Sequence, residues 1–324
     1  MKKTFFKTFF ISIAIFSLLW GGYIYKNVLN VPENGEETYK ENFIDRLVDD
    51  NDEITFLLLG IDAKDVMKSK GTRTDTMMLC KADKSTGEIA ILSIPRDTRC
   101  YIRGRKNEEK ITHAHAYGGP ELSMKAVKDL LGVDVEYYVR VDYNIVKEFV
   151  KLVDGVEVNV PIDMEYSDPY ADPPLYINLS KGYQTLDGDQ AIQFLRFRKG
   201  NKGGKPGYPE GDLGRIKAQQ QFMQAAIDKV LKPKNIPKIP QMMQSYYKNV
   251  DTNIPMDILL KFAIKAKSFS TEKMEMATLP GDGEYIGGIS YFIADKEASE
   301  TLVKTMFSEH RAVTNIEEDE TETN

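Results

Sequence analysis

Residues 54–62 read ITFLLLGID, a run of apolar residues that ends in a carboxylate. Further strand-like runs lie at residues 76–81, 89–94, 137–141 and 155–160. Several of them are apolar at almost every position, which is typical of strands buried on both faces of a sheet. These runs therefore predict strands of a sheet that is covered on both faces.

Helical patterns alternate with these strands, and this alternation favours an α/β fold. The two runs at 76–81 and 89–94 are joined by the short turn-forming stretch DKSTG, so they are expected to pair as an antiparallel hairpin. The sequence thus predicts a mixed central β-sheet with helices on both faces. The helices expected in this core lie at residues 120–131, 143–153, 188–194 and 214–231.

The N-terminus carries a basic start followed by a run without charge from Thr8 to Tyr25. About 18 residues are just enough to span a membrane, and the lysines before the run favour a cytoplasmic N-terminus. A cleaved signal peptide shares these features, but it would have a small-residue cleavage site, whereas this run ends in aromatic residues. We therefore expect residues 1–25 to form a retained single-pass anchor in the cell membrane, with the rest of the chain extracytoplasmic.

The remaining chain divides by composition. Residues 26–52 are rich in Glu, Asp and Asn and are expected to form a stalk. Residues 53–312 are expected to form one folded domain, with a core at 53–232 and a C-terminal extension at 233–312 that packs on the same core. The extension should contain helices at 240–247 and 256–267 and a strand at 274–279. Residues 313–324 are almost entirely acidic and polar, which predicts a disordered tail.

Charge and cysteine content limit the possible functions. The net charge of −6 argues against a generic nucleic-acid binder, which would usually be basic, so no nucleic-acid partner is expected. The two cysteines, Cys80 and Cys100, could form a disulfide in an oxidising compartment, but each adjoins a predicted strand. Two unpaired, partly buried thiols are the favoured interpretation.

Charged residues gather where the predicted strands end or begin. Asp62 follows the first strand, Arg73 and Asp75 precede the second, and Arg96 and Asp97 follow the third. Ligands of open α/β sheets bind at such an edge, and two carboxylates suit a hard cation such as magnesium. A strand-end Asp alone more often stabilises a turn, so the repeated charged pairs favour a functional site.

A second group of charges lies between residues 196 and 217, which hold seven basic and two acidic residues. The alternation in LRFR predicts an extended segment with Arg196 and Arg198 on one face. Arg215 and Gln219 are four residues apart on a predicted helix, and Asp212 is expected to cap it. Arginines near a helix N-terminus indicate a phosphate-type ligand.

Other motifs are less informative. His113 and His115 lie beside a Gly-Gly turn, and without a third ligand they are weak evidence for zinc. A Walker loop, a nucleophile elbow and a dinucleotide-binding fingerprint are all missing from the sequence.

In this order, the motifs resemble those of the LytR-CpsA-Psr family of bacterial cell-wall proteins. The resemblance covers about residues 52–231, and its matching segments are LLLGID, GTRTDTMML, LSIPRDT, KITHAHAYGG, LDGDQAIQFLRFR and DLGRIKAQQQF. Two departures concern fine contacts: Thr112 stands where the family often has Asn, and Ala218 where a second basic residue is frequent.

The resemblance implies a phosphotransferase of the polyisoprenyl-teichoic acid–peptidoglycan teichoic acid transferase type. It would transfer a glycopolymer, such as teichoic acid or capsule, from a polyprenyl-pyrophosphate carrier to peptidoglycan. Polyprenyl phosphate would be released, and the membrane lipid would be a further partner. By similarity Asp62 and Asp75 would hold magnesium, with manganese as the alternative metal. The pyrophosphate would be bound by Arg73, Arg96, Arg196, Arg198, Arg215 and Gln219.

Three questions of mechanism stay open at this stage. Arg96 is expected to act in catalysis, and the base for the attacking hydroxyl is expected to be Asp97 or Asp212. A polyprenyl-pyrophosphate hydrolase would use the same site with water as the acceptor. A non-catalytic envelope regulator, such as a transcription attenuator, is the alternative from another class.

Overall fold

The fold is described from a computed structural model of residues 52–61, 71–170, 174–201, 207–239, 242 and 250–307. The expected anchor, stalk and acidic tail lie outside these residues, as does most of the helix expected at 240–247. Within the described ranges, each helix is too short or too polar to cross a membrane.

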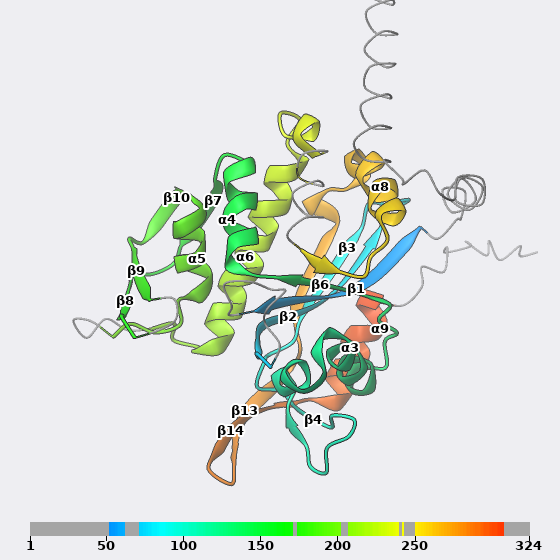
Figure 1. Ribbon diagram of the computed structural model, residues 1–324, viewed down its shortest axis with the longest axis vertical. Coiled ribbons are helices and arrows are strands. Elements are labelled where there is room, and N and C mark those ends of the chain that lie inside the picture. Colours follow the sequence, from blue (N-terminus) through cyan, green and yellow to red (C-terminus); the bar gives the residue numbers. More distant parts are fainter. Residues whose placement is uncertain are drawn as a thin grey trace, which may run out of the picture.

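The core is a six-stranded mixed sheet in the order β11-β6-β1-β2-β3-β12 (Figure 1). β1 pairs with β2 antiparallel and with β6 parallel, and β3 pairs with β2 antiparallel and with β12 parallel. The α/β class, the mixed sheet and the β2–β3 hairpin are therefore confirmed. The strands are β1 (Glu53–Ile61), β2 (Thr74–Asp83), β3 (Ile89–Ser93), β6 (Tyr137–Val141), β11 (Asp251–Thr252) and β12 (Met274–Thr278).

Alternate residues of the apolar strands point to opposite layers of helices. Leu57 and Leu59 of β1 join the cluster formed with helices α3 (Thr112–Leu131) and α9 (Lys296–Phe307). Phe56 and Leu58 pack instead toward α6 (Asp212–Leu231) and α8 (Met256–Ile264). Burial on both faces explains why the run is apolar throughout, and it confirms the prediction of helices on both sides.

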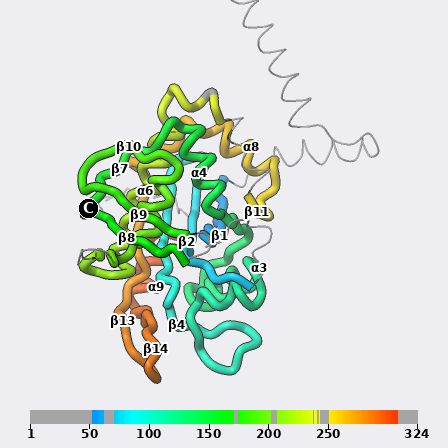
Figure 2. The backbone as a smooth tube through the Cα atoms, turned by 60° about the vertical axis from the view of Figure 1, so that its left-hand side comes forward, coloured from blue at the N-terminus to red at the C-terminus, as the bar shows by residue number. Residues whose placement is uncertain are grey.

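A second hydrophobic cluster lies beside the sheet and shares α6 with it (Figures 1 and 2). Two small antiparallel pairs, β7–β10 and β8–β9, pack there against α4, α5 and α6. Of these strands the sequence predicted only β7, and it wrongly grouped β7 with the strands of the central sheet. The elements are α4 (Tyr143–Leu152), β7 (Val156–Val160), β8 (Met164–Asp168), β9 (Leu175–Leu179), β10 (Gly182–Leu186) and α5 (Gly188–Arg196).

The segment after residue 232 contributes to the same core. β11 and β12 are the two edge strands of the central sheet, and Val303 and Met306 of α9 are buried against α3. In the sequence, a hairpin of β13 (Gly281–Ile286) and β14 (Ile289–Ala294) lies between β12 and α9. It extends from the body in both views (Figures 1 and 2). It lies next to the short pair β4 (Arg99–Cys100) and β5 (Glu109–Lys110).

Helix α3 is two helical segments divided by a kink at Gly118 and Gly119. Gly119 has a positive φ of 67°, which favours glycine, and Pro120 starts the second segment where the sequence predicted the helix. The first segment carries Thr112, His113 and His115, so the histidines lie on a helix rather than in an open turn.

The cysteine interpretation is confirmed, because Cys80 and Cys100 are both buried and unpaired. Burial raises the pKa of each thiol to about 12, with nearby carboxylates adding to the shift at Cys100. Both side chains therefore behave as small core residues rather than nucleophiles.

Candidate functional site

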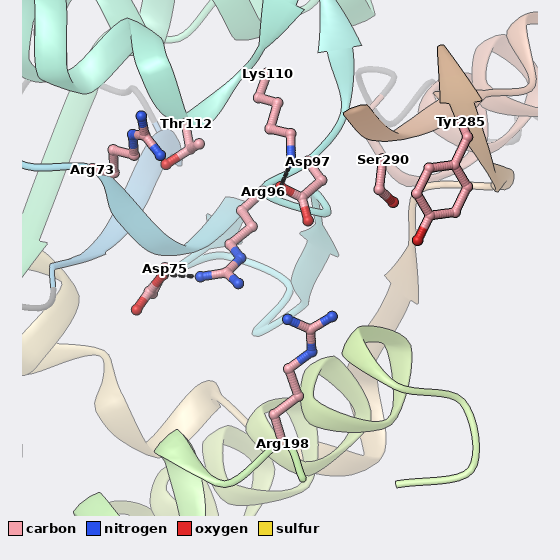
Figure 3. Close-up of a pocket in the computed structure, with 9 residues that line it drawn as sticks. All are labelled: Arg73, Asp75, Arg96, Asp97, Lys110, Thr112, Arg198, Tyr285 and Ser290. Carbon is pink, nitrogen blue, oxygen red and sulfur yellow. Dashed lines mark hydrogen bonds and ion pairs between the residues drawn. The ribbon is translucent and has the colours of Figure 1, made fainter. Parts of the chain in front are cut away.

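A cavity of about 340 Å³ opens at the sheet edge where β1 and β3 end and β2 begins (Figure 3). This is the edge at which the sequence placed the charged pairs. Four cationic and two anionic side chains line the cavity, together with two hydroxyl side chains and one tyrosine. The lining residues are Arg73, Asp75, Arg96, Asp97, Lys110, Thr112, Arg198, Tyr285 and Ser290.

Arg96 lies at the centre of the cavity, where it forms an ion pair with Asp75 of β2 (Figure 3). Burial opposes the charge of Arg96, but Asp75, Asp212 and Asp97 together raise its pKa. Its Nε is buried and has no hydrogen-bond partner in the part of the chain that the structure describes. The guanidinium lines the cavity, so its charge can attract an anion there.

Thr112, at the start of α3, connects the loop of Arg96 to the start of β2. Its Oγ1 donates to the Thr74 carbonyl at 2.6 Å, and its backbone N–H donates to the Arg96 carbonyl at 3.3 Å. The two charged segments of the cavity are therefore held in a fixed register. A threonine can make these contacts at the position where the family often has Asn.

Asp97 forms an ion pair with Lys110 of β5, with 2.8 Å between Oδ1 and Nζ. Both side chains line the cavity, so Lys110 is a site residue that the sequence reasoning missed. The available signal was its position two residues before Thr112, at the start of the quoted motif KITHAHAYGG.

The N-terminus of α6 brings a second group of charges next to the first. Arg215 is buried, and its Nη2 lies 2.8 Å from Oδ1 of Asp212, which also lies 3.7 Å from Nε of Arg198. Burial lowers the pKa of Arg215, while Asp212 and Asp75 oppose this effect and Arg96 and Arg198 add to it. The arginine still carries its charge at neutral pH. Its influence on Arg96 and Arg198 places these guanidinium groups in one electrostatic cluster.

The prediction that Asp212 caps α6 is wrong. The N-cap residue is Gly211, which has a positive φ, and Asp212 is the first residue of the helix. Its carboxylate pairs with Arg215 instead of accepting from the backbone. Gln219 lies one turn beyond Arg215, is buried, and its Nε2 donates to the Leu195 carbonyl at 3.5 Å. Gln219 therefore joins α6 to the end of α5.

The predicted extended segment from Leu195 to Arg198 is also wrong in part, because α5 continues to Arg196. Asp187 and Gln190 form a capping box that starts this helix, and its apolar face is buried. Arg196 stacks on the ring of Tyr143, with 4.6 Å from its guanidinium carbon to the ring centroid. Arg198, which follows the helix, lines the cavity, whereas Arg196 is not among the lining residues given above.

The structure describes one of the two residues that are expected to hold magnesium. Asp62 lies outside the described residues, while Asp75 lies in the cavity with its carboxylate paired to Arg96. An accessible carboxylate is a donor that magnesium prefers, so Asp75 fits such a site. Within the described residues, three or more His, Cys, Asp or Glu side chains nowhere form a cluster suited to a metal.

Together these side chains form a site suited to a polyanion. Cations from the residue before β2, the loop after β3, β5 and the segment after α5 converge on one cavity, and Arg215 is buried nearby. Arginine binds phosphate oxygens through two N–H donors at once. Carboxylates among the cations supply an oxygen ligand or a proton acceptor.

Comparisons with known proteins show which family the chain resembles in sequence and fold. The model of the LytR_cpsA_psr family matches residues 23–308. The chain is 30% identical to the polyisoprenyl-teichoic acid–peptidoglycan teichoic acid transferase TagU of Bacillus licheniformis, over 92% of this chain and 93% of that protein. The crystal structure of B. subtilis TagV has a TM-score of 0.66 and 29% identity, and covers 78% of this chain and 95% of its own.

A structure of TagT bound to LIIa-WTA is also similar, with a TM-score of 0.61 and 27% identity over 79% of this chain and 90% of that one. The family model matches the segments that form the cavity, and the relative from B. licheniformis is covered over most of its length. The chain therefore belongs to the LytR_cpsA_psr family.

Proposed function

We propose that this protein is a phosphotransferase that attaches an anionic glycopolymer from a polyprenyl-pyrophosphate carrier to peptidoglycan and releases polyprenyl phosphate. The observation that carries the proposal is the cavity, where Arg73, Arg96, Arg198 and Lys110 surround a space of about 340 Å³. The relatives named teichoic acid transferases, which match over most of their length, support the same reaction.

In this reaction a peptidoglycan hydroxyl attacks the phosphorus next to the glycopolymer. The new O–P bond forms as the bond to the bridging oxygen breaks, and that electron pair leaves with polyprenyl phosphate. Phosphoryl transfer requires mainly alignment and neutralisation of charge. The guanidinium groups of Arg73, Arg96 and Arg198 would bind the phosphate oxygens, and the buried charge of Arg215 would add to the positive field.

The hydroxyl proton needs an acceptor, and Asp97 is the better placed of the two candidates. Its carboxylate lines the cavity beside Lys110, within reach of a group bound there. Asp212 lies instead between Arg215 and Arg198, and it is not among the residues given above as lining the cavity. We therefore propose that Asp97 is the base and that Asp212 positions the two arginines.

We also propose that Asp75, together with Asp62, holds magnesium, with manganese as the alternative. When bound, the metal would neutralise phosphate charge that the arginines leave uncompensated. Binding of a prenyl diphosphate should then depend on magnesium, and Asp75→Asn should raise the magnesium concentration needed for half-maximal binding. Identical magnesium titrations of the wild type and the variant would remove Asp75 from the metal site.

Product analysis tests the transferase proposal. The full chain is incubated with a polyprenyl-pyrophosphate-linked glycopolymer, with and without peptidoglycan oligomers, and the products are separated by mass. Transfer predicts a glycopolymer–peptidoglycan phosphodiester together with polyprenyl phosphate, and loss of both in Asp97→Asn. Purely hydrolytic products in the presence of peptidoglycan would show a hydrolase instead.

We further propose that residues 1–25 anchor the protein in the cell membrane, with the N-terminus in the cytoplasm and the domain outside. The support is the uncharged run from Thr8 to Tyr25 after three lysines. Protease added outside intact protoplasts should digest the domain and leave a short N-terminal fragment. Digestion of the domain only after lysis would contradict this topology.

A further inference from the structure

The β13–β14 hairpin forms one wall of the cavity, and its two faces differ in what they contact. Tyr285 and Ser290 are directly paired across the hairpin, so their side chains project from the same face. The turn between the strands is Gly287-Gly288, with φ values of 60° and 81°. Two positive φ values are typical of a tight hairpin turn, which fixes this register.

The end of the hairpin nearest the sheet is attached to the loop after β3, residues 94–98, which is called the catalytic loop below because it carries Arg96 and Asp97. Phe292, two residues after Ser290, lies on the same face of β14 and is buried in the core beneath the sheet edge. Its backbone N–H donates to the Asp97 carbonyl at 2.9 Å, and it forms an isolated bridge with Thr98. The position of the hairpin is therefore set relative to Asp97.

The opposite face of the hairpin is held by cations. The ring of Tyr291 lies 5.7 Å from the guanidinium carbon of Arg99 and 5.8 Å from Nζ of Lys110, measured to its centroid. Since Lys110 also pairs with Asp97, the hairpin, β5 and the catalytic loop are connected.

Tyr285 at the tip lacks the packing that holds the base. Its side chain is 79% exposed, yet it lines the cavity together with Ser290 (Figure 3). Among the lining residues that the structure describes, it is the one aromatic side chain, and the others are charged or carry a hydroxyl group. A large apolar ring is thus held in solvent at the edge of a phosphate-binding cavity by a hairpin of fixed register.

We propose that Tyr285 is a stacking platform for a sugar ring of a glycan substrate beside the phosphates. The face of a pyranose presents C–H groups of partial positive charge, which match the negative face of an aromatic ring. The hydroxyl groups of Ser290 and of Tyr285 itself would accept or donate hydrogen bonds to the sugar hydroxyls. The sugar ring would then orient the reacting oxygen or phosphorus toward Arg96 and Asp97.

The surroundings of Tyr285 favour a sugar over the prenyl chain. An apolar chain is stabilised where it is removed from water, and a ring that is largely exposed beside charged residues provides no such enclosure. A sugar adjoins the phosphate in the glycopolymer, and another carries the hydroxyl in peptidoglycan. Either source presents the same chemistry to the ring, and binding measurements distinguish them.

This inference rests on the proposed function, and its test separates the two. Affinities of the full chain are measured for a disaccharide-linked prenyl diphosphate, for the same prenyl diphosphate without sugar, and for a peptidoglycan oligosaccharide. Tyr285→Ala should weaken binding of the donor disaccharide or of the peptidoglycan oligosaccharide about five- to twentyfold, the effect of losing one central aromatic contact. Binding of the sugar-free diphosphate should stay unchanged.

Two further variants control the measurement. Tyr285→Phe keeps the stacking face and should retain most of the affinity. Tyr183 of β10 is 80% exposed, which matches Tyr285, and it lies beside the cluster of α4 and α5. Tyr183→Ala should leave the affinity for all three ligands unchanged. Thermal unfolding of Tyr285→Ala should match the wild type, because its ring is not packed in the core.

Each outcome decides the inference. Unchanged affinity for both sugar-bearing ligands, or an equal loss for the sugar-free diphosphate, would overturn the stacking role while leaving the phosphate site in place. Failure of the wild type to bind either diphosphate, with normal binding of the oligosaccharide through Tyr285, would overturn the proposed function and leave the sugar platform. Failure to bind all three ligands would remove both.

Discussion

Arg198 is the cation that reaches the cavity from the segment after α5, and nearly half of its side chain is exposed. Oδ1 of Asp212 lies 2.8 Å from Nη2 of Arg215 but 3.7 Å from Nε of Arg198. Because Asp212 pairs more closely with Arg215, the Arg198 guanidinium is available for a ligand. At the scale of the residue, the proposed function depends on such partly satisfied cations. Each would supply a charge-assisted contact when the anion binds.

Replacing Arg198 by Ala should lower the rate of transfer more than tenfold, because a charge-assisted contact contributes about 1.5–3 kcal/mol. Transfer is measured with the full chain and a prenyl-diphosphate donor. Arg103→Ala is the control, since Arg103 is an exposed arginine whose ion pair with Asp129 lies outside the cavity lining. Equal activity of the two variants would contradict the site assignment.

His115 is a buried residue close to the cavity that the mechanism does not use directly. Its Nδ1–H donates to the Thr72 carbonyl at 2.8 Å, and Nε2 accepts from Nη1 of Arg140 at 3.3 Å. These contacts require the neutral ring. Burial is the main cause that lowers its pKa, and Arg140 adds to it, while the Thr72 carbonyl, Glu121 and Asp251 oppose the shift.

The lowered pKa gives a pH dependence of stability. Between the unfolded pKa of about 6.5 and the lower folded pKa, the unfolded chain binds more protons, so stability falls as the pH falls. His115→Asn keeps a donor for Thr72 but cannot titrate. The free energy of unfolding should therefore decrease more steeply for the wild type than for the variant as the pH is lowered from 7 to 5. Parallel curves in denaturant titrations would exclude this contribution.

At the scale of the element, the N-terminus of α6 depends on close packing at Gly214. A Cβ at this position would lie 2.4 Å from Cβ of Tyr208 and 2.7 Å from its Cγ. Tyr208 itself is buried and packs edge-on against Phe197. The packing of Gly214 on Tyr208 thus determines where α6 places Asp212 and Arg215.

Gly214→Ala should cost about 1–3 kcal/mol of stability, as overpacking does in buried sites. Transfer should fall as well, because the displaced helix carries Arg215. Gly283→Ala is the matched control, since its added Cβ meets nothing closer than 4.0 Å. Thermal unfolding and transfer rates measure both effects. If stability and transfer of Gly214→Ala equalled those of the wild type, the loop of Tyr208 would have moved to accommodate the added methyl group.

At the scale of the whole molecule, α6 joins the two hydrophobic clusters. Phe222 and Ala226 face the cluster of α4 and α5, while Met223 and Ile227 pack on the sheet. Arg198, which follows α5, lines the cavity together with Arg73 and Arg96 from the edge of the sheet. The cavity therefore needs segments from both clusters that α6 joins. The site therefore exists only when both clusters are folded.

This coupling predicts a single unfolding transition. Phe194→Ala in one cluster and Met78→Ala in the other should each cost about 2–5 kcal/mol, since both side chains are fully buried. Both should lower the same transition temperature, as calorimetry of the full chain can show. Two separate transitions, each sensitive to one variant, would mean that the clusters fold independently.

The sequence by itself located five strands of the central sheet, β1, β2, β3, β6 and β12, because apolar runs bounded by turn residues report burial directly; it missed the two-residue β11. It also located most cavity cations, since charges at strand ends must meet at one sheet edge. It failed for Leu195 to Arg198, where alternation indicated an extended chain but the capping box at Asp187 and the buried face of α5 favour helix.

Only the tertiary structure decided the partners of each charge. The pairing of Asp97 with Lys110, the stacking of Arg196 on Tyr143, and the approach of Tyr285 to the cavity join residues far apart in the chain. Local patterns carry no information on such distances, because side-chain contacts follow from how helices and strands pack. The chemistry of the site was thus readable from residue types, whereas its geometry was fixed by the packing of α6 and of the β13–β14 hairpin against the sheet.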